Sequence, residues 1–430
     1  MKHACLLGSL LWIAACGSVD TPVTVDAAEV PSPDASLRGE VSITVLDTQT
    51  AAPLDGRHVL FLEADGTLAA DEVVDVDGHA AAEVGPGATV VLIYELDAEA
   101  GAVYYFGVNP GDALRFGGYN GVGTATLALT FPTRAGADDY DVLGSCAGGT
   151  VFAGTVVAPP IALTNLHCAP GDTLDVVVRA RDAGNIVATL AVTDETFAPT
   201  LTIGGTYRTP QAFAADVTGL PAAVTDVSAT MAAEVGVIDI TGVSTSVAPV
   251  NGTASFASAS FDDIPGSRLR SSLSLSRADL GPLTVYDNRA FDGTSATIAA
   301  DDLAPWASGP VQDYATGTLA WSEIGGGSAD TFFVLTGVPD GSNHFVYAGG
   351  PLAGASSFTF PPLPPAYSAF SMVGPAPMPG SISLLLLKMN GLADAAQLDP
   401  ISIFFGIIQG TLARGVDADV TVSYSNAASN

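Results

Sequence analysis

The sequence predicts an all-β protein made of tandem β-sandwich modules of the immunoglobulin-like or transthyretin-like kind. Apolar and polar residues alternate with period two along much of the 430-residue chain, for example over residues 41–45, 174–180 and 273–275, and this period is typical of half-buried strands. Asp-Gly and Asn-Gly pairs separate the runs and tolerate the positive φ of tight hairpins. A β-propeller-like body is the alternative architecture, although no blade period of about 40–50 residues recurs.

The chain begins with a predicted lipoprotein signal peptide over residues 1–15. The apolar run over residues 6–15 is too short to span about 30 Å of hydrocarbon as a helix. The sequence Ile13-Ala14-Ala15-Cys16 resembles a bacterial lipobox, in which small residues permit cleavage and the cysteine thiol takes the diacylglyceryl group. This resemblance implies that Cys16 becomes an acylated N-terminus that anchors the protein in a membrane. An ordinary signal peptide that happens to end near a cysteine is the alternative.

Residues 16–37 follow as a predicted flexible tether, because prolines and scattered acids occur there without any period. Gly17, rather than an aspartate, follows the cysteine and favours transport to the outer membrane. We therefore expect an exported protein, held in the outer membrane by its lipid and facing the periplasm or the cell exterior. The membrane is its expected partner through this anchor.

Charge excludes one class of function. Asp and Glu number 45 and Lys and Arg 14, for a net charge of −31, and the lysines are Lys2 and Lys388. Nothing basic is available to neutralise phosphates, so we expect no nucleic-acid partner.

The cysteine positions predict one disulfide. Cys5 lies in the predicted signal peptide and Cys16 is the predicted acylation site. This leaves Cys146 and Cys168 as a pair in an exported protein. Their bond would close a loop of about 22 residues and stabilise the fold by about 3 kcal/mol. A metal site with His167 beside Cys168 is the alternative, but it lacks a second close pair of ligands.

Beyond the tether we expect four modules, over residues 38–131, 132–200, 201–304 and 305–430. A faint repeat suggests that they are related, since Pro110-Gly111-Asp112 and Pro170-Gly171-Asp172 each precede alternating strand patterns. Residues 382–387 predict a fully buried strand, and residues 391–398 predict the one short helix.

Residues 39–92 carry a family resemblance. They include Gly39, Val45-Leu46-Asp47, Pro53-Leu54-Asp55-Gly56, Asp75-Val76-Asp77-Gly78 and Pro86-Gly87. This pattern resembles the carboxypeptidase-regulatory-like, or transthyretin-like, β-sandwich, with Ala88 as a departure where tyrosine is common. The resemblance implies a non-catalytic sandwich that spaces or presents other domains.

Candidate catalytic patterns are weak. Residues 144–148 read G-x-C-x-G around Cys146, with His167 or His344 as partners, but the residues that follow are β-branched and not helical, unlike a nucleophile elbow. His58 and His79 complete the histidines after the leader, and no metal-ligand spacing occurs. Acid clusters near residues 71–77, 138–141, 262–263 and 301–302 offer Ca²⁺ ligands, but none has the twelve-residue loop pattern with a closing Glu, and solvated turns are the favoured explanation. We predict no catalytic residue, metal or cofactor.

Aromatic residues offer one candidate binding site. Trp306, Tyr314 and Trp321 lie close in sequence and could stack on sugar rings if they were exposed on one sheet face, although core packing is the more common role of such residues. The sequence therefore favours a non-enzymatic cell-envelope lipoprotein with a binding, adhesion or structural role, whose partner would be a glycan or an envelope protein. An exported hydrolase of polysaccharide or peptide with accessory β-sandwich domains is the alternative.

Overall fold

Twenty-eight strands and one 3-10 helix make up the described part of the chain, so the predicted all-β class is confirmed. The structure is a computed structural model. It describes residues 38–47, 52–96, 99–117, 125–146, 152–166, 168–236, 238–262, 267–290, 295–300, 302–337, 344–352, 354–374, 382–391 and 419–428. The predicted leader, Cys16, the tether and the predicted helix beyond Gly391 lie outside these residues. No helix among them is long and apolar enough to cross a membrane.

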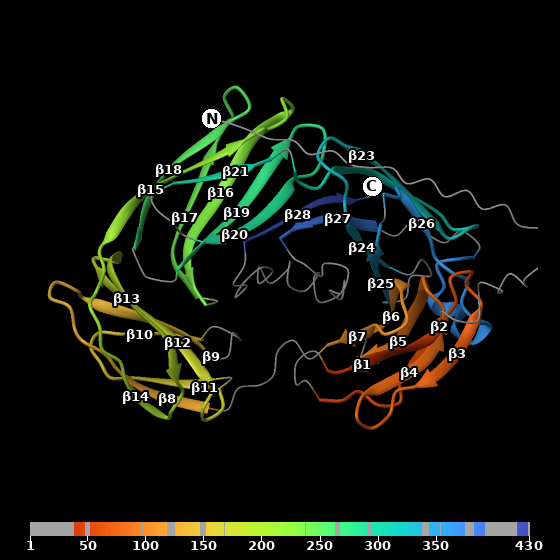
Figure 1. The fold of residues 1–430 in the computed structure, drawn as a ribbon, viewed down its shortest axis with the longest axis horizontal. Coiled ribbons are helices and arrows are strands. Elements are labelled where there is room, and N and C mark those ends of the chain that lie inside the picture. The colour runs from red at the N-terminus through yellow and green to blue at the C-terminus, as the bar shows by residue number, and fades with distance from the viewer. Residues whose placement is uncertain are drawn as a thin grey trace, which may run out of the picture. The chain divides into compact units, whose positions relative to one another are not determined.

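Three successive stretches of seven strands share one β-sandwich arrangement (Figure 1). In each stretch the third, second, fifth and sixth strands form one sheet in that order. The fourth, first and seventh strands form the second sheet, in which the first strand is antiparallel to the fourth and parallel to the seventh. Apolar side chains from the two sheets of each stretch meet in a core. The tandem β-sandwich prediction is therefore confirmed.

The three stretches have the following strands, in chain order. The first contains β1 (Gly39–Val45), β2 (His58–Leu62), β3 (Leu68–Val73), β4 (His79–Val84), β5 (Ala88–Leu96), β6 (Glu99–Val108) and β7 (Ala113–Phe116). The second contains β8 (Ala125–Thr130), β9 (Asp139–Cys146), β10 (Phe152–Val156), β11 (Ile161–Leu166), β12 (Thr173–Asp182), β13 (Asn185–Thr196) and β14 (Thr200–Thr202). The third contains β15 (Pro210–Thr218), β16 (Val224–Val235), β17 (Ile238–Val247), β18 (Ala254–Asp262), β19 (Arg268–Arg277), β20 (Leu283–Ala290) and β21 (Ser295–Ala299).

The fourth stretch is a permuted version of the same arrangement. Its elements are β22 (Trp306–Asp313), β23 (Thr318–Ile324), β24 (Thr331–Gly337), β25 (His344–Pro351), β26 (Ser357–Thr359), the 3-10 helix η1 (Pro365–Phe370), β27 (Ile382–Asn390) and β28 (Val420–Ala428). Strands β23 to β28 take positions one to six, and β22, which precedes them, takes the place of the seventh strand. Because β22 joins β23 through a hairpin, this pair is antiparallel.

The larger sheets of the first, third and fourth stretches join edge to edge into one sheet of twelve strands, which begins at β17 and ends at β3. Strand β20 pairs antiparallel with β28, and β25 pairs parallel with β6. A propeller blade is a sheet of four antiparallel strands, so this sheet does not fit the alternative architecture.

Several strands of the joined sheet are buried on both faces. Val59 and Phe61 of β2 face one core, and Leu60 and Leu62 face another on the opposite side. Strand β27 divides its side chains between the same two cores. This burial explains why these strands read as continuous apolar runs rather than alternating ones, and it confirms the buried strand predicted over residues 382–387.

The two Pro-Gly-Asp sequences form the same turn. The carboxylate of Asp112 accepts a hydrogen bond from the backbone N–H of Asn109 at 2.8 Å, and that of Asp172 accepts one from Ala169 at 2.6 Å. The central glycine has φ 94° in the first turn and 96° in the second, a region that glycine adopts without strain. The predicted repeat therefore extends to turn geometry.

Strand pairing moves the first module boundary. The sequence places it at residue 131, after β8, but β8 pairs with β11 and β14 of the second stretch. The gap between stretches one and two therefore lies before residue 125. Likewise, the boundary expected at residue 200 falls at the start of β14, which closes the second stretch.

Two buried serines tie the start of the fourth stretch to the joined sheet. Ser423 Oγ accepts a hydrogen bond from the backbone N–H of Ala304 at 2.7 Å, and Ser425 Oγ accepts one from Ala307 at 2.9 Å. Both serines lie on β28 and are buried. Ser271, on β19 of the same sheet, is equally buried, but its hydroxyl has no partner in the described structure.

We expect Ser423→Ala and Ser425→Ala each to destabilise β22 by about 1–3 kcal/mol, because each change leaves a buried N–H without an acceptor. Hydrogen exchange of the amides in residues 303–308 measures this opening free energy. Ser271→Ala is the matched control and should leave it nearly unchanged. Equal effects of all three substitutions would show that the hydroxyls do not act as ties.

Candidate functional site

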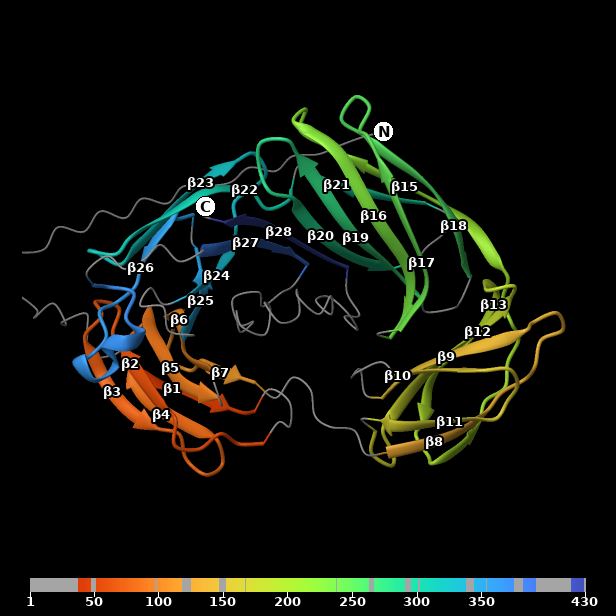
Figure 2. The same ribbon diagram turned by 180° about the vertical axis from the view of Figure 1, so that it is seen from behind.

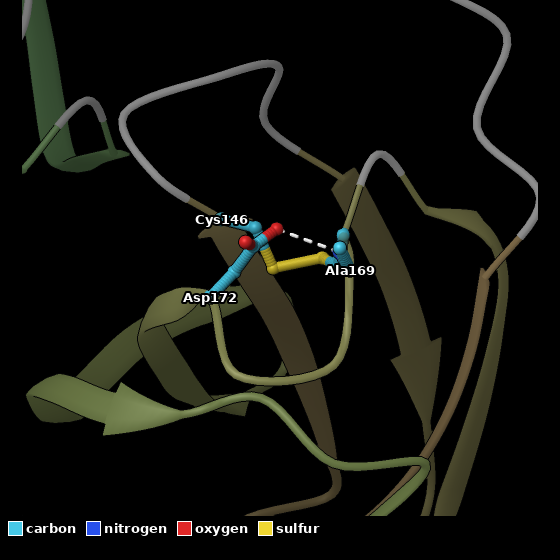
Figure 3. Close-up of a disulfide and its surroundings, with 4 residues drawn as sticks. Cys146, Ala169 and Asp172 are labelled. Atoms are coloured by element: carbon cyan, nitrogen blue, oxygen red, sulfur yellow. Dashed lines mark hydrogen bonds between the residues drawn. A yellow bond between two sulfur atoms is a disulfide. The ribbon is translucent and has the colours of Figure 1, made fainter.

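Cys146 and Cys168 form the predicted disulfide (Figure 3), with Cα atoms 5.4 Å apart. The bond joins the end of β9 to the segment just before the Pro-Gly-Asp turn that leads into β12. It consumes the thiol that a nucleophile elbow over residues 144–148 would need. His167, the proposed partner in that site and in the metal alternative, lies outside the described residues.

The predicted glycan-binding aromatics do not share an exposed face. Trp306 is 2% exposed and packs in the core of the third stretch, where the Arg277 guanidinium lies 5.2 Å from its ring centroid. Trp321 is 6% exposed and packs in a different core. Tyr314 is partly buried against that second core. Stacking on a sugar needs an open ring face, so these three residues do not form the expected strip, and their large apolar area instead fills the cores.

Acidic clusters of the described residues hold turns and strands together. Asp75 accepts backbone hydrogen bonds from His79 at 2.8 Å and Asp77 at 3.0 Å, and these bonds, that of His79 foremost, lower its pKa. Asp139 and Asp141 both bind Arg181, at 2.7 and 3.2 Å.

Metal ligands do not converge in this part of the chain: among the described residues, no three His, Cys, Asp or Glu side chains are placed to hold an ion. Asp302, from another predicted cluster, binds the Lys388 ammonium group at 2.6 Å. Asp263 and Asp301, from the remaining clusters, lie outside the described residues.

A surface pocket lies where three segments meet. The turn after β19, the start of β22 and the end of β28 contribute its walls, over residues 278–282, 307–310 and 426–427. Asp279 is the acidic residue in this lining, and Arg277 binds its carboxylate at 2.8 Å. That ion pair lowers the pKa of Asp279, so its charge is already balanced by the protein.

Three titratable side chains converge at the β3 end of the joined sheet. Asp71 Oδ1 lies 2.9 Å from His58 Nδ1, and the Tyr367 hydroxyl lies 2.8 Å from both Asp71 Oδ2 and His58 Nδ1. His58 is on β2, Asp71 is on β3, and Tyr367 is on η1, which Figure 2 shows beside these two strands. We call these three residues the edge cluster.

Proton positions in the edge cluster follow from the hydrogen bonds. Burial and the hydrogen bond to Asp71 raise the pKa of Tyr367 to about 12, so the phenol keeps its proton and donates to the Asp71 carboxylate. His58 then carries its proton on Nδ1, because that nitrogen faces two oxygen acceptors. The cluster thus ties η1 to the edge of the sheet.

His58 and Asp71 are visible in the sequence as a histidine and as part of an acid cluster. Tyr367 follows 309 residues after His58, and no pattern in the sequence links them. Among the described strands, the parallel pairing of β25 with β6 joins their two stretches in one sheet.

Among the described strands, none pairs with the outer edge of β3. Backbone hydrogen bonds of β3 among the described residues go to β2, its one partner in the sheet. Leu68 is 47% exposed, Val73 is 54% exposed and Val76, just beyond the strand, is 77% exposed. Such an edge is a template for another strand unless charge or bulges protect it.

Comparisons with known proteins do not assign a family. No protein-family model and no curated protein matches this chain. Among solved structures, the Bacillus anthracis TIE protein is 11% identical with a TM-score of 0.16, and the match covers 61% of this chain and 50% of that one. A putative adhesin from Bacteroides ovatus is 8% identical with a TM-score of 0.17, covering 41% and 93%. The major pilin subunit BcpA of Bacillus cereus is 10% identical with a TM-score of 0.15, covering 61% and 98%. This chain spans half the length of the first of these structures. Identities and TM-scores this low do not assign a function to it.

We expect Tyr367→Phe to loosen η1 and β3 by about 1 kcal/mol, because it removes the hydroxyl that binds Asp71 and His58. Hydrogen exchange of residues 68–73 and 365–370 measures the change. Tyr314→Phe is the control, since its hydroxyl has no hydrogen-bond partner in the described structure. If both variants exchange alike, the edge cluster is not a tie.

The stabilisation from the Tyr367 hydroxyl should be lost at alkaline pH. Folding raises the phenol pKa from an ordinary value of 10.0 to about 12, so the stabilisation is complete below pH 10 and disappears as the pH rises through about 12. Exchange of residues 365–370 should accelerate over that window in the wild type more than in Tyr367→Phe.

Proposed function

We propose that this protein is a non-enzymatic cell-envelope lipoprotein, anchored in the outer membrane by Cys16, whose β-sandwich body has a binding, adhesion or structural role. Support for the anchor comes from the Ile13-Ala14-Ala15-Cys16 sequence and the tether that follows it. Two or more acyl chains on Cys16 would suffice for stable attachment.

Export is supported by the disulfide. Cys146 and Cys168 are the two cysteines that follow the lipid site, and they are bonded to each other. Disulfides persist in oxidising compartments such as the periplasm and the cell surface and are rare in the cytosol.

The joined sheet is the observation that carries the structural part of the proposal. The first, third and fourth stretches share one sheet of twelve hydrogen-bonded strands. A mechanical force applied to one of these sandwiches is therefore transmitted to the others through continuous backbone pairing. The carboxylates of the acidic clusters described above bind backbone amides, Arg181, Lys388, or the His58 and Tyr367 side chains. The carboxypeptidase-regulatory-like resemblance of residues 39–92 supports a presenting role for the first sandwich.

We expect Cys16→Ser to release the protein from membranes, because the acylated thiol is lost. Fractionation of cells, with metabolic labelling by a palmitate analogue, measures this. Cys5→Ser is the matched control, since that residue lies in the predicted leader, and it should leave labelling and membrane association intact. A Cys16→Ser protein that still labels and sediments with membranes would rule out the anchor.

A further inference from the structure

We propose that the open edge of β3 binds an extended, basic segment of another polypeptide, which adds to the twelve-stranded sheet as a further strand. This inference rests on the proposed binding role and supplies the class of partner. Main-chain hydrogen bonds would provide affinity, and alternate side chains would provide selectivity, as in other cases of strand addition.

The protein itself uses the equivalent edge in this way. Strand β3 is the third strand of the first stretch, and β25 occupies the third position in the fourth stretch. The outer edge of β25 is filled by β6, with His344 to Gly349 opposite Ala100 to Tyr105 in parallel register. The corresponding edge of β3 ends the joined sheet, so the fold already shows that a third strand in this arrangement accepts a partner.

Backbone groups of β3 are oriented for a ladder. The N–H of Val74 donates to Arg57 O at 2.8 Å, and the carbonyl of Val74 accepts from the N–H of Gly56 at 2.9 Å, so both groups of Val74 face β2. Because backbone groups alternate along a strand, those of Val73 and Asp71 face outward. The edge cluster fixes Asp71 in place, so the outward groups are held ready for a partner.

Side chains beside this edge combine apolar area with negative charge. Leu68, Val73 and Val76 are exposed apolar residues at the strand and just beyond it. Glu72 and Asp77 are exposed acids in the same segment. Asp71 contributes less to an incoming strand, because Tyr367 and His58 already bind its carboxylate.

Charge selects the occupant. A second copy of this chain would bring a net charge of −31 and the same acidic edge, and like charges oppose such pairing. A segment that alternates basic and apolar residues instead matches Glu72 and Asp77 electrostatically and covers Leu68 and Val73. The competing explanation is that the acids only keep the edge from pairing with anything.

The test uses the full chain in detergent and a labelled peptide that alternates valine and lysine. One control peptide has the same sequence with N-methylated amides on one side of the strand, which keeps its charge but blocks the ladder. A second control replaces lysine with glutamate. Three protein variants are compared. Glu72→Lys reverses a charge beside the edge, and Val73→Pro removes an outward N–H at a position where edge strands tolerate proline. Glu40→Lys, on β1, is the control for a change in net charge. Fluorescence anisotropy reports affinity and hydrogen exchange locates the site.

We expect the valine–lysine peptide to bind and to slow exchange at residues 68–73. N-methylation and Glu72→Lys should each weaken binding by at least tenfold, while Glu40→Lys changes it by less than twofold. Unchanged affinity of the N-methylated peptide, or protection elsewhere than β3, overturns the proposal. So does sedimentation of the wild type as a dimer that Val73→Pro dissociates, because the edge would then belong to a second copy. Each result is independent of acylation at Cys16, so it is distinguishable from failure of the lipoprotein proposal.

Discussion

The parallel pairing of β6 with β25 is the contact on which most of the structure depends. It places residues 100–105 against residues 344–349 and so makes one sheet from the first and fourth sandwiches. Both faces of β2, β5 and β27 are then buried, in cores that contain side chains from both sandwiches. Without this pairing Leu60 and Leu62 would face water, and burial of a leucine side chain is worth about 1.5–3 kcal/mol.

Local patterns in the sequence predict the strands well but not their joining. Period-two alternation and Asp-Gly turns predict the all-β class. The predicted signal peptide and lipobox account for the other two cysteines and so leave Cys146 to pair with Cys168. The run over residues 382–387 predicts a buried strand because four leucines in a row leave no polar face. Joining β25 to β6 depends on packing between segments 244 residues apart, as His344 opposite Ala100 shows, and no local pattern encodes that.

In the candidate site, too, the sequence predicts local features but not which distant residues come together. The sequence favours core packing of Trp306 and Trp321 over stacking on sugars, because tryptophan usually supplies buried area. The sequence does not show which cores they fill, and the structure places them in two different cores. The sequence singles out His58 as a histidine and Asp71 as part of an acidic cluster. It does not single out Tyr367, which lies 309 residues beyond His58 and reaches both side chains from η1. The open edge of β3 is likewise a property of the assembled sheet, because an edge is defined by which strand has no further neighbour.

Native-state hydrogen exchange with increasing denaturant tests the central claim, which is that one sheet unites the sandwiches. Amides of β6 and β25 should become exposed in a single unfolding event with a common free energy and a common denaturant dependence. If the amides of β25 instead open with the fourth sandwich alone, while β6 stays protected with a different free energy, the two strands are not paired and the chain is a row of independent modules.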